Sequence, residues 1–346
     1  MKKKLLSILL TAAMATTVVS GTALIVNADS ESDLSGKTFA IVIRNSGNPY
    51  AEKEADGFKQ VIEAAGGECI IKSPEKATAD AQIPLIQSLI SQEVDAIAIA
   101  SNDVNALTAC LQDAMDEGIK VLSLDSNVVP EARQTFVNQA GVTEIGQALA
   151  DAVYDISGGS GEFAILSASS QSANQNSWID AMKEVMKDDK YSKLELVEVA
   201  YGDDEPQKST DVTQALLQTY PDLKVICAPT TVGIAAAAKV LQDNGSSCKL
   251  TGLGLPSEMS EYIGDDDAHS CPYMFLWNPE DVGRLGAYTS IALVNEEITG
   301  VAGDKFTAGD LGEYEVTEAS DGGTEVILGS PFIFDPSNID EWKDVY

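Results

Sequence analysis

Short apolar runs and amphipathic stretches alternate along most of the chain. In its first part the predicted strands are 38–44, 69–71, 94–100 and 121–124, and the predicted helices are 50–65, 78–91 and 104–117. Pro84 lies inside the second of these helices, so we expect the regular part of that helix to begin near it. The alternating order with short connections predicts a parallel sheet with helices on both faces.

The same rhythm begins again after the glycine-rich residues 158–161. An extended piece at 136–140 and a helix at 143–153 lead into it. The later predicted strands are 163–167, 194–200, 225–228, 250–253 and 274–276, and the later predicted helices are 178–186, 208–220, 234–243, 258–263 and 281–295. From Thr307 onward only short strands and turns are expected. The chain is therefore predicted to be an α/β protein, with one βα sheet followed by a second of similar size.

Composition narrows the class of protein. A length of 346 residues suggests two domains, and a hydrophobic fraction of 44% argues against disorder. The chain carries 54 acidic and 22 basic residues, for a formal net charge of −32. Such a protein repels phosphate backbones and anionic lipid, so we expect no nucleic-acid partner. The acidic surface suits a soluble protein with an uncharged or cationic ligand.

The first 28 residues have the pattern of a signal peptide. Lys2, Lys3 and Lys4 precede an apolar stretch at 5–19, and the segment 26–28 offers small residues at the two positions that a signal peptidase reads, so cleavage is expected after Ala28. We therefore expect export, to the periplasm or to the outer cell surface. A membrane anchor is the alternative, because weak apolar character continues beyond the stretch. No cysteine follows that stretch, so a lipoprotein anchor is not expected.

The five cysteines form no C-x-x-C pair, which argues against a zinc or redox site. Cys248 and Cys271 each lie just before an apolar strand. If these strands are neighbours in a parallel sheet, both residues lie at the same sheet edge, and we predict a disulfide between them in an oxidising compartment. Free thiols are the alternative. Cys110 and Cys227 lie in apolar patterns and are expected to be buried thiols.

Polar side chains follow many of the predicted strands. Asp125 ends the strand 121–124, and open α/β sheets bind ligands in the crevice outside the carboxyl ends of their strands. Other strand ends carry Arg44, Asn45, Asn102, Asp103, Asn127, Asn174, Gln175, Asn176, Pro229, Thr230, Thr231, Trp277 and Asn278. One cation, a few acids, several amides and an aromatic ring suit a polyhydroxylated ligand, because each hydroxyl both donates and accepts. The alternatives are a turn at Asp125, a surface ion pair at Arg44 and a helix cap at 174–176.

Signals for catalysis are weak. The single histidine, His269, stands beside three aspartates in a predicted loop, and no G-x-S-x-G motif is present. Paired carboxylates for glycoside hydrolysis stay open as an alternative, since 54 acidic residues provide many chance pairs. We expect a binding protein rather than an enzyme, with no cofactor and no metal.

Several motifs together resemble a known family. They are GNPY at 47–50, VDAIAI at 94–99, DS at 125–126, FVNQ at 136–139, NQNSW at 174–178, APTT at 228–231 and LWNP at 276–279. The mature chain resembles the sugar-type (type I) periplasmic binding proteins of ABC importers, and within them the subgroup of autoinducer-2-binding and rhamnose-binding proteins. The resemblance covers about residues 37–346.

This resemblance implies two Rossmann-like lobes with parallel sheets, joined by three crossovers that act as a hinge. Lobe 1 would be 37–137 plus 279–305, and lobe 2 would be 138–278 plus 306–346. The implied partners are a small sugar-like ligand and the membrane permease of the importer, and we expect a monomer. A receptor that serves chemotaxis or quorum sensing without import is a further alternative.

The resemblance also implies binding residues. Autoinducer-2 receptors hold their ligand with a Lys, an Asp, an Asp-Gln pair, and a Pro and an Ala two residues apart. Asp125, Gln175 and Pro229 match this pattern, whereas Arg44, Asn174 and Thr231 stand in place of the Lys, the Asp and the Ala. We expect Arg44 and Asp125 to bind ligand from lobe 1, and Asn174, Gln175, Pro229 and Thr231 from lobe 2, with Trp277 beside them. Autoinducer-2 or a similar polyol is expected slightly ahead of rhamnose.

Overall fold

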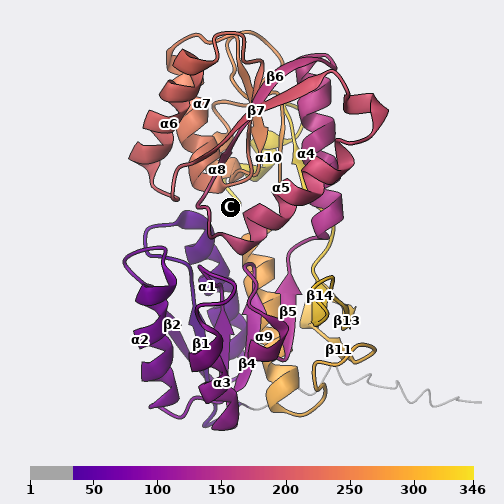
Figure 1. Cartoon of the computed structure of the whole chain (residues 1–346). Helices are drawn as coiled ribbons and strands as arrows, with labels where there is room; N and C mark the ends of the chain where they lie inside the picture. The colour runs from indigo at the N-terminus through magenta and orange to yellow at the C-terminus, as the bar shows by residue number, and fades with distance from the viewer. Residues whose placement is uncertain (1–33) are drawn as a thin grey trace, which may run out of the picture. The chain divides into compact units, whose positions relative to one another are not determined.

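The computed structural model describes residues 34–346, so the predicted signal peptide at 1–28 lies outside the described residues. Within this part no helix is both long enough and apolar enough to cross a membrane. The described residues form an α/β fold with two separate parallel sheets (Figure 1). We call lobe 1 the part built on the seven-stranded sheet and lobe 2 the part built on the four-stranded sheet.

The central strands of the lobe 1 sheet, β1, β3, β4 and β5, are short and buried on both faces. Its spatial order is β13 (Thr317–Glu318), β14 (Thr324–Ile327), β5 (Thr135–Asn138), β4 (Lys120–Leu124), β3 (Ala96–Ile99), β1 (Thr38–Val42) and β2 (Glu68–Lys72). The strands from β14 to β2 pair in parallel, and β13 is antiparallel to β14. Successive side chains of β1 alternate between the two faces, so that Ile41 packs with one layer of helices and Val42 with the other.

Two pairs of helices cover this sheet. One face packs against α1 (Pro49–Ala64) and α9 (Pro279–Val294), and the other against α2 (Ala79–Ile90) and α3 (Thr108–Asp116). α1 and α9 lie very close together, because Gly57 and Gly283 remove the side chains that would separate their backbones. This layering buries the near-continuous apolar runs from which the strands were predicted.

Lobe 2 repeats the architecture. Its sheet has the order β7 (Leu194–Tyr201), β6 (Gly161–Ser167), β8 (Val225–Ala228) and β9 (Lys249–Gly252), all parallel. β10 (Met274–Leu276) adjoins β9 through a bridge from Leu253 to Phe275 and pairs antiparallel with β15 (Phe332–Phe334). The helices of this lobe are α4 (Val142–Ser157), α5 (Ala173–Val185), α6 (Pro206–Thr219), α7 (Thr231–Asp243), α8 (Pro256–Met259) and α10 (Ile339–Trp342).

The chain passes between the two sheets after β5, before α9 and after β14. Strand pairing corrects one expected lobe limit. Residues 317–327 were predicted in lobe 2, but β14 pairs with β5 and so adds to the sheet of lobe 1. In the remaining tail, β11 (Lys305–Thr307) pairs with β12 (Glu313–Glu315). The other limits of the two lobes stay a prediction.

The regular part of α2 and the start of α5 both lie earlier in the chain than expected. α2 begins at Ala79, five residues before Pro84, because Ala79, Gln82 and Ile86 all gain burial from the helical form. That burial offsets the one backbone hydrogen bond that the proline removes. α5 begins at Ala173 rather than at residue 178, so Asn174 and Gln175 lie in its first turn instead of in a loop.

The predicted disulfide is wrong in this structure, where Cys248 and Cys271 are both buried free thiols. The strands that follow them are neighbours, as expected, but the register is not suitable. The Leu250 N–H donates to the Ser270 carbonyl at 2.8 Å, so Cys271 lies beside Leu250 and not opposite Cys248. The two residues are therefore offset along neighbouring segments, and their thiols are not bonded.

Candidate functional site

A cavity of about 40 Å³ lies where the carboxyl ends of the strands of both lobes meet. It is lined by Arg44, Asn48, Tyr50, Asp125, Asn174, Gln175, Trp178, Asp204, Pro229, Thr230, Thr231, Leu253, Leu276 and Trp277. All seven binding residues expected from the sequence are among them. They come from segments far apart in the chain, and the fold brings their side chains together around one cavity.

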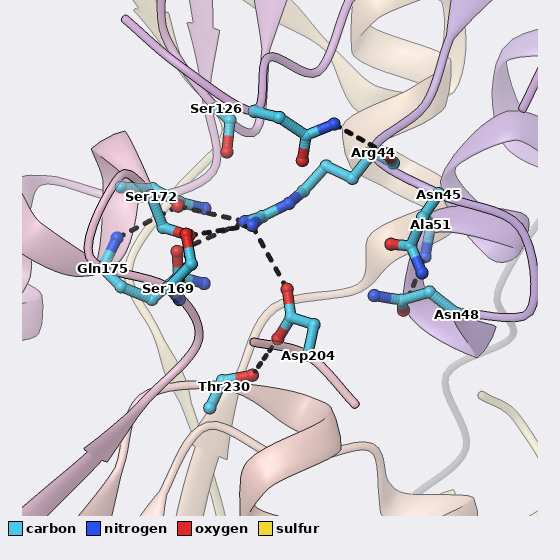
Figure 2. Close-up of polar contacts among 12 residues, drawn as sticks. Arg44, Asn45, Asn48, Ala51, Ser126, Ser169, Ser172, Gln175, Asp204 and Thr230 are labelled. Carbon is cyan, nitrogen blue, oxygen red and sulfur yellow. Dashed lines mark hydrogen bonds and ion pairs between the residues drawn. The ribbon is translucent and has the colours of Figure 1, made fainter. Parts of the chain in front are cut away.

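Arg44 is the centre of the polar contacts, and it reaches from lobe 1 into lobe 2 (Figure 2). It follows β1 directly, and its guanidinium donates to Asn174 Oδ1 at 3.3 Å, Gln175 Oε1 at 3.2 Å and Ser172 Oγ at 3.0 Å. Asp204 Oδ2 lies 3.2 Å from the same group, in an ion pair that is almost fully buried. The Nε of Arg44 is buried without a partner, which leaves one donor free for a ligand.

A layer of amides below the cavity fixes the backbone at Arg44. Asn102 donates from Nδ2 to the Arg44 carbonyl at 2.8 Å, and its own N–H donates to Gln82 Oε1 at 2.9 Å. Gln82 in turn donates to the carbonyls of Ile43 and Ala100. Asn102 therefore supports the site without lining the cavity. Together with Gln82 it connects the residues that follow β1 to those that follow β3.

Asp125 comes directly after β4 and is 4% exposed. Its backbone has φ +56°, a conformation that costs energy in a residue other than glycine and that concentrates at functional sites. Asn174 Nδ2 donates to Asp125 Oδ2 at 3.3 Å, and Gln139 Nε2 donates to Oδ1 at 3.4 Å. Burial raises the pKa of Asp125 to about 6, although Arg44 and the Tyr50 hydroxyl oppose that shift.

The first turn of α5 supplies two amides from lobe 2. Asn174 accepts from Arg44 through Oδ1 and donates to Asp125 through Nδ2, so it connects the two charged residues of lobe 1. Gln175 accepts from Arg44 beside it. Each amide carries both donors and acceptors, which is the complement that a sugar hydroxyl requires.

The other side of the cavity is aromatic and apolar. Trp277 follows β10, and its Nε1 donates to the Tyr50 hydroxyl of α1 at 2.6 Å, a contact between the lobes. Trp178 of α5 packs edge-on against Trp277 with ring centroids 5.6 Å apart. Leu253 and Leu276 complete this wall. Trp178 is buried and also lines the cavity.

Asp204 is the main residue that the sequence reasoning missed. It ends the loop after β7, has φ +52°, and accepts from Thr230 Oγ1 at 2.7 Å while it pairs with Arg44. Its signal was the same as that of Asp125, an acid after a predicted strand. Tyr50 and Asn48 were also missed as cavity residues; Asn48 caps α1 by accepting from the N–H groups of Tyr50 and Ala51.

Other polar strand ends do not reach the cavity. Asn127 contacts Ser123 and Asp321, and Asn278 caps α9 by accepting from the Glu280 N–H. His269 contacts Asp266 of its own loop. Among the residues that the structure describes, no group of three or more His, Cys, Asp or Glu side chains could hold a metal ion.

The family model of the periplasmic binding protein domain matches residues 39–298. The chain belongs to the periplasmic binding protein family. This confirms the expected fold, as well as the expected resemblance. Because the family consists of binding components of transport systems, it also confirms a binding protein in place of a hydrolase.

Solved structures place this periplasmic binding protein among sugar-binding relatives. An ABC transporter solute binding protein from Clostridium phytofermentas with bound L-rhamnose is 61% identical, with a TM-score of 0.89 over 90% of this chain and 99% of that one. LsrB from Clostridium saccharobutylicum, in complex with AI-2 (autoinducer-2), is 22% identical, with a TM-score of 0.82 over 88% and 99%, and shows the shared fold.

A curated relative, the D-ribose/D-allose-binding protein of Pseudomonas aeruginosa, is 26% identical over 199 residues. The match covers 55% of this chain and spans 58% of the length of that relative. It supports the sugar-binding branch of the family but leaves the particular sugar open.

Proposed function

We propose that this chain is the solute-binding protein of an ABC importer and that its ligand is L-rhamnose. One observation carries the choice of ligand: the relative with bound L-rhamnose is 61% identical over nearly the whole described chain. Export, delivery to a membrane permease and a monomeric state belong to the same proposal.

The cavity offers a complementary surface for such a sugar. Arg44 and Asp125 would bind hydroxyls from lobe 1, and Asn174 and Gln175 from lobe 2, where Pro229 and Thr231 also line the cavity. Hydrogen bonds to charged partners contribute roughly 1.5–3 kcal/mol each, against about 1 for neutral pairs. A ligand held by both lobes stabilises their closed arrangement, and a permease can recognise that arrangement.

The apolar wall suits one further feature of rhamnose. A 6-deoxy sugar carries a methyl group where other hexoses carry a hydroxymethyl group. Trp277, Leu253 and Leu276 form a surface on which a methyl group is buried favourably and on which a hydroxyl would lose its hydrogen bonds to water. The wall therefore favours a deoxy sugar over its hydroxylated counterpart.

Small ligand sites usually enclose about 300–1,000 Å³, much more than the roughly 40 Å³ found here. Admission of a sugar therefore requires the lobes to separate and Arg44 to exchange some of its present partners for ligand hydroxyls. Hinge motion at the three crossovers would provide this change.

Autoinducer-2 is the second candidate. Asp125, Gln175 and Pro229 all line the cavity and match the residues that the autoinducer-2 receptors use. The amide of Asn174 and the side chain of Thr231 depart from that pattern. Both residues line the cavity from lobe 2, and Arg44, the third departure, lines it from lobe 1.

Calorimetric titration of the protein without its predicted signal peptide tests the proposal. The ligands are L-rhamnose, L-lyxose (which lacks the methyl group), L-mannose (which adds a hydroxyl to it), autoinducer-2 and D-ribose. We expect saturable binding of L-rhamnose, binding at least tenfold weaker for L-lyxose and L-mannose, and loss of binding in Asp125→Ala. Asp243→Ala, in an exposed ion pair of α7, is the matched control and should bind normally. If only autoinducer-2 binds, it takes the place of L-rhamnose as the proposed ligand. If none of the five compounds binds, the proposal is overturned.

A further inference from the structure

A second buried carboxyl lies beneath the cavity. Glu54 of α1 is 1% exposed and stands one helical turn after Tyr50, so both side chains lie on the same face of the helix. α9 packs closely against the backbone of this turn: a Cβ at Gly283 would lie 1.9 Å from the Glu54 carbonyl oxygen. Water therefore has little access to the Glu54 side chain.

The Glu54 carboxyl has no partner that would stabilise a negative charge. Among residues 34–346, none of the ion pairs or hydrogen bonds involves its carboxyl group, and its Oε1 is buried without a partner. The cation that acts on the Glu54 carboxyl is Arg44, which is already engaged by Asp204 at 3.2 Å and by three neutral side chains. An unpaired buried carboxylate is very costly, and such a group normally keeps its proton instead.

The surrounding charges act in the same direction. Burial raises the pKa of Glu54 well above its ordinary value, the negative charge of Asp125 raises it further, and Arg44 opposes both. The third titratable group that faces it, Tyr50, is itself buried, with a raised pKa. Ionisation of Glu54 would thus place a second negative charge next to Asp125 and in competition for Arg44.

We propose that Glu54 is a positioning residue of the sugar site, which keeps its proton at neutral pH so that Asp125 alone of this pair is charged and free to accept hydrogen bonds from the ligand. The part that concerns the ligand rests on the proposed function. The protonation of Glu54 itself is a property of the ligand-free protein and is tested separately.

Unfolding of the ligand-free protein tests the protonated state. An acid that keeps its proton only in the folded protein stabilises the fold most at low pH and loses this contribution as the pH rises. The unfolding constant of wild type, divided by that of Glu54→Gln, should therefore rise by up to tenfold per pH unit above about pH 5. The rise should continue beyond pH 7, where Asp125 no longer titrates. Glu63→Gln, an exposed carboxyl of the same helix, is the control and should give a constant ratio. A constant ratio for Glu54→Gln from pH 5 to 8 would overturn the proposal.

Infrared spectroscopy of the wild type covers the case in which the variant does not fold. At pH 8 a carbonyl stretch of a protonated carboxyl group should persist in the folded protein and disappear on unfolding. A folded wild type without this band at pH 8 would contradict the proposal directly.

Titration with L-rhamnose tests the positioning role. At pH 7 Glu54→Gln should bind within about threefold of wild type, because an amide replaces a neutral acid of the same shape. At alkaline pH the wild type should lose affinity by up to tenfold per pH unit relative to Glu54→Gln. Identical pH profiles, or more than a tenfold loss in Glu54→Gln at pH 7, would exclude the role. If no sugar binds, the proposed function fails while the unfolding and infrared results still decide the protonation.

Discussion

At the scale of single residues, Asp125 determines how binding depends on pH. Burial raises its pKa to about 6 in the ligand-free protein, because burial outweighs the opposing effects of Arg44, Tyr50 and Ser126. Ligand hydroxyls donate to the ionised form and so lower this pKa again. We expect the affinity for L-rhamnose to fall by up to tenfold per pH unit below about pH 6 and to stay level from pH 6.5 to 8. Calorimetry between pH 5 and 8 measures this directly.

The stability of the ligand-free protein should show the opposite sign. A folded pKa above the ordinary 3.8 means that the Asp125 contribution is fully present below pH 3.8 and is lost as the pH rises through about 6. Asp125→Asn removes this pH dependence and should gain stability relative to wild type over the same window.

The affinity for L-rhamnose decides the role of Asp125 in binding. If that affinity does not change between pH 5 and 6.5, Asp125 does not accept hydrogen bonds from the ligand.

At the scale of elements, the close packing of α1 on α9 fixes the position of α1, which carries Tyr50 into the cavity. A methyl group at Gly283 would lie 1.9 Å from a backbone oxygen of α1, whereas at Gly286 it would meet the flexible end of Leu124 at 3.0 Å. We expect Gly283→Ala to destabilise the protein by about 2 kcal/mol or more, since two backbones must move apart. Gly286→Ala should change stability by less than about 1 kcal/mol, because the helix propensity of alanine offsets the tighter contact.

Urea unfolding of the two alanine variants, followed by titration with L-rhamnose, compares them directly. Gly283→Ala should also bind less tightly, because α1 carries Tyr50 into the cavity. If Gly283→Ala and Gly286→Ala have the same free energy of unfolding, α1 and α9 are not packed as closely as in this structure.

The elements differ in how far their sequences determine them. The strand at 225–228 and the strand at 274–276 follow from local apolar pattern alone, and both have the predicted limits. The start of α5 does not, because its first turn is polar and Ser172 makes no side-chain cap; tertiary contacts of Asn174 and Gln175 with Arg44 hold it instead. Such contacts join residues about 130 positions apart and leave no local signal.

The candidate site shows the same division. Residues at strand ends could be predicted, because the fold class alone says where ligands bind. The pairing of Asp204 with Arg44 and the offset of Cys271 from Cys248 depend on the register between distant segments. A register is set by packing of whole sheets, so no pattern within a single segment contains it.

At the scale of the whole molecule, Arg44 connects the two lobes even without a ligand. Its ion pair with Asp204 and its three hydrogen bonds all cross from lobe 1 to lobe 2, and the Tyr50–Trp277 contact adds to them. These contacts stabilise a closed arrangement of the lobes. A bound ligand must either fit beside these contacts or replace some of them. The ligand-free protein should therefore populate closed as well as open states, and the Asp204 contact should shift their ratio.

Asp204→Asn tests this coupling. Removal of one partner from a buried ion pair costs roughly 3–5 kcal/mol, which is enough to change a closed-to-open ratio by more than a hundredfold. We expect small-angle X-ray scattering to give a larger radius of gyration for ligand-free Asp204→Asn than for ligand-free wild type. Saturating L-rhamnose should bring both to the same value, because the ligand itself then joins the lobes. Asp243→Asn, in the exposed pair with Lys239, should match wild type in both states. If the ligand-free radii of wild type and Asp204→Asn agree while the sugar compacts both, closure depends on the ligand alone and the Arg44 contacts form only after it binds.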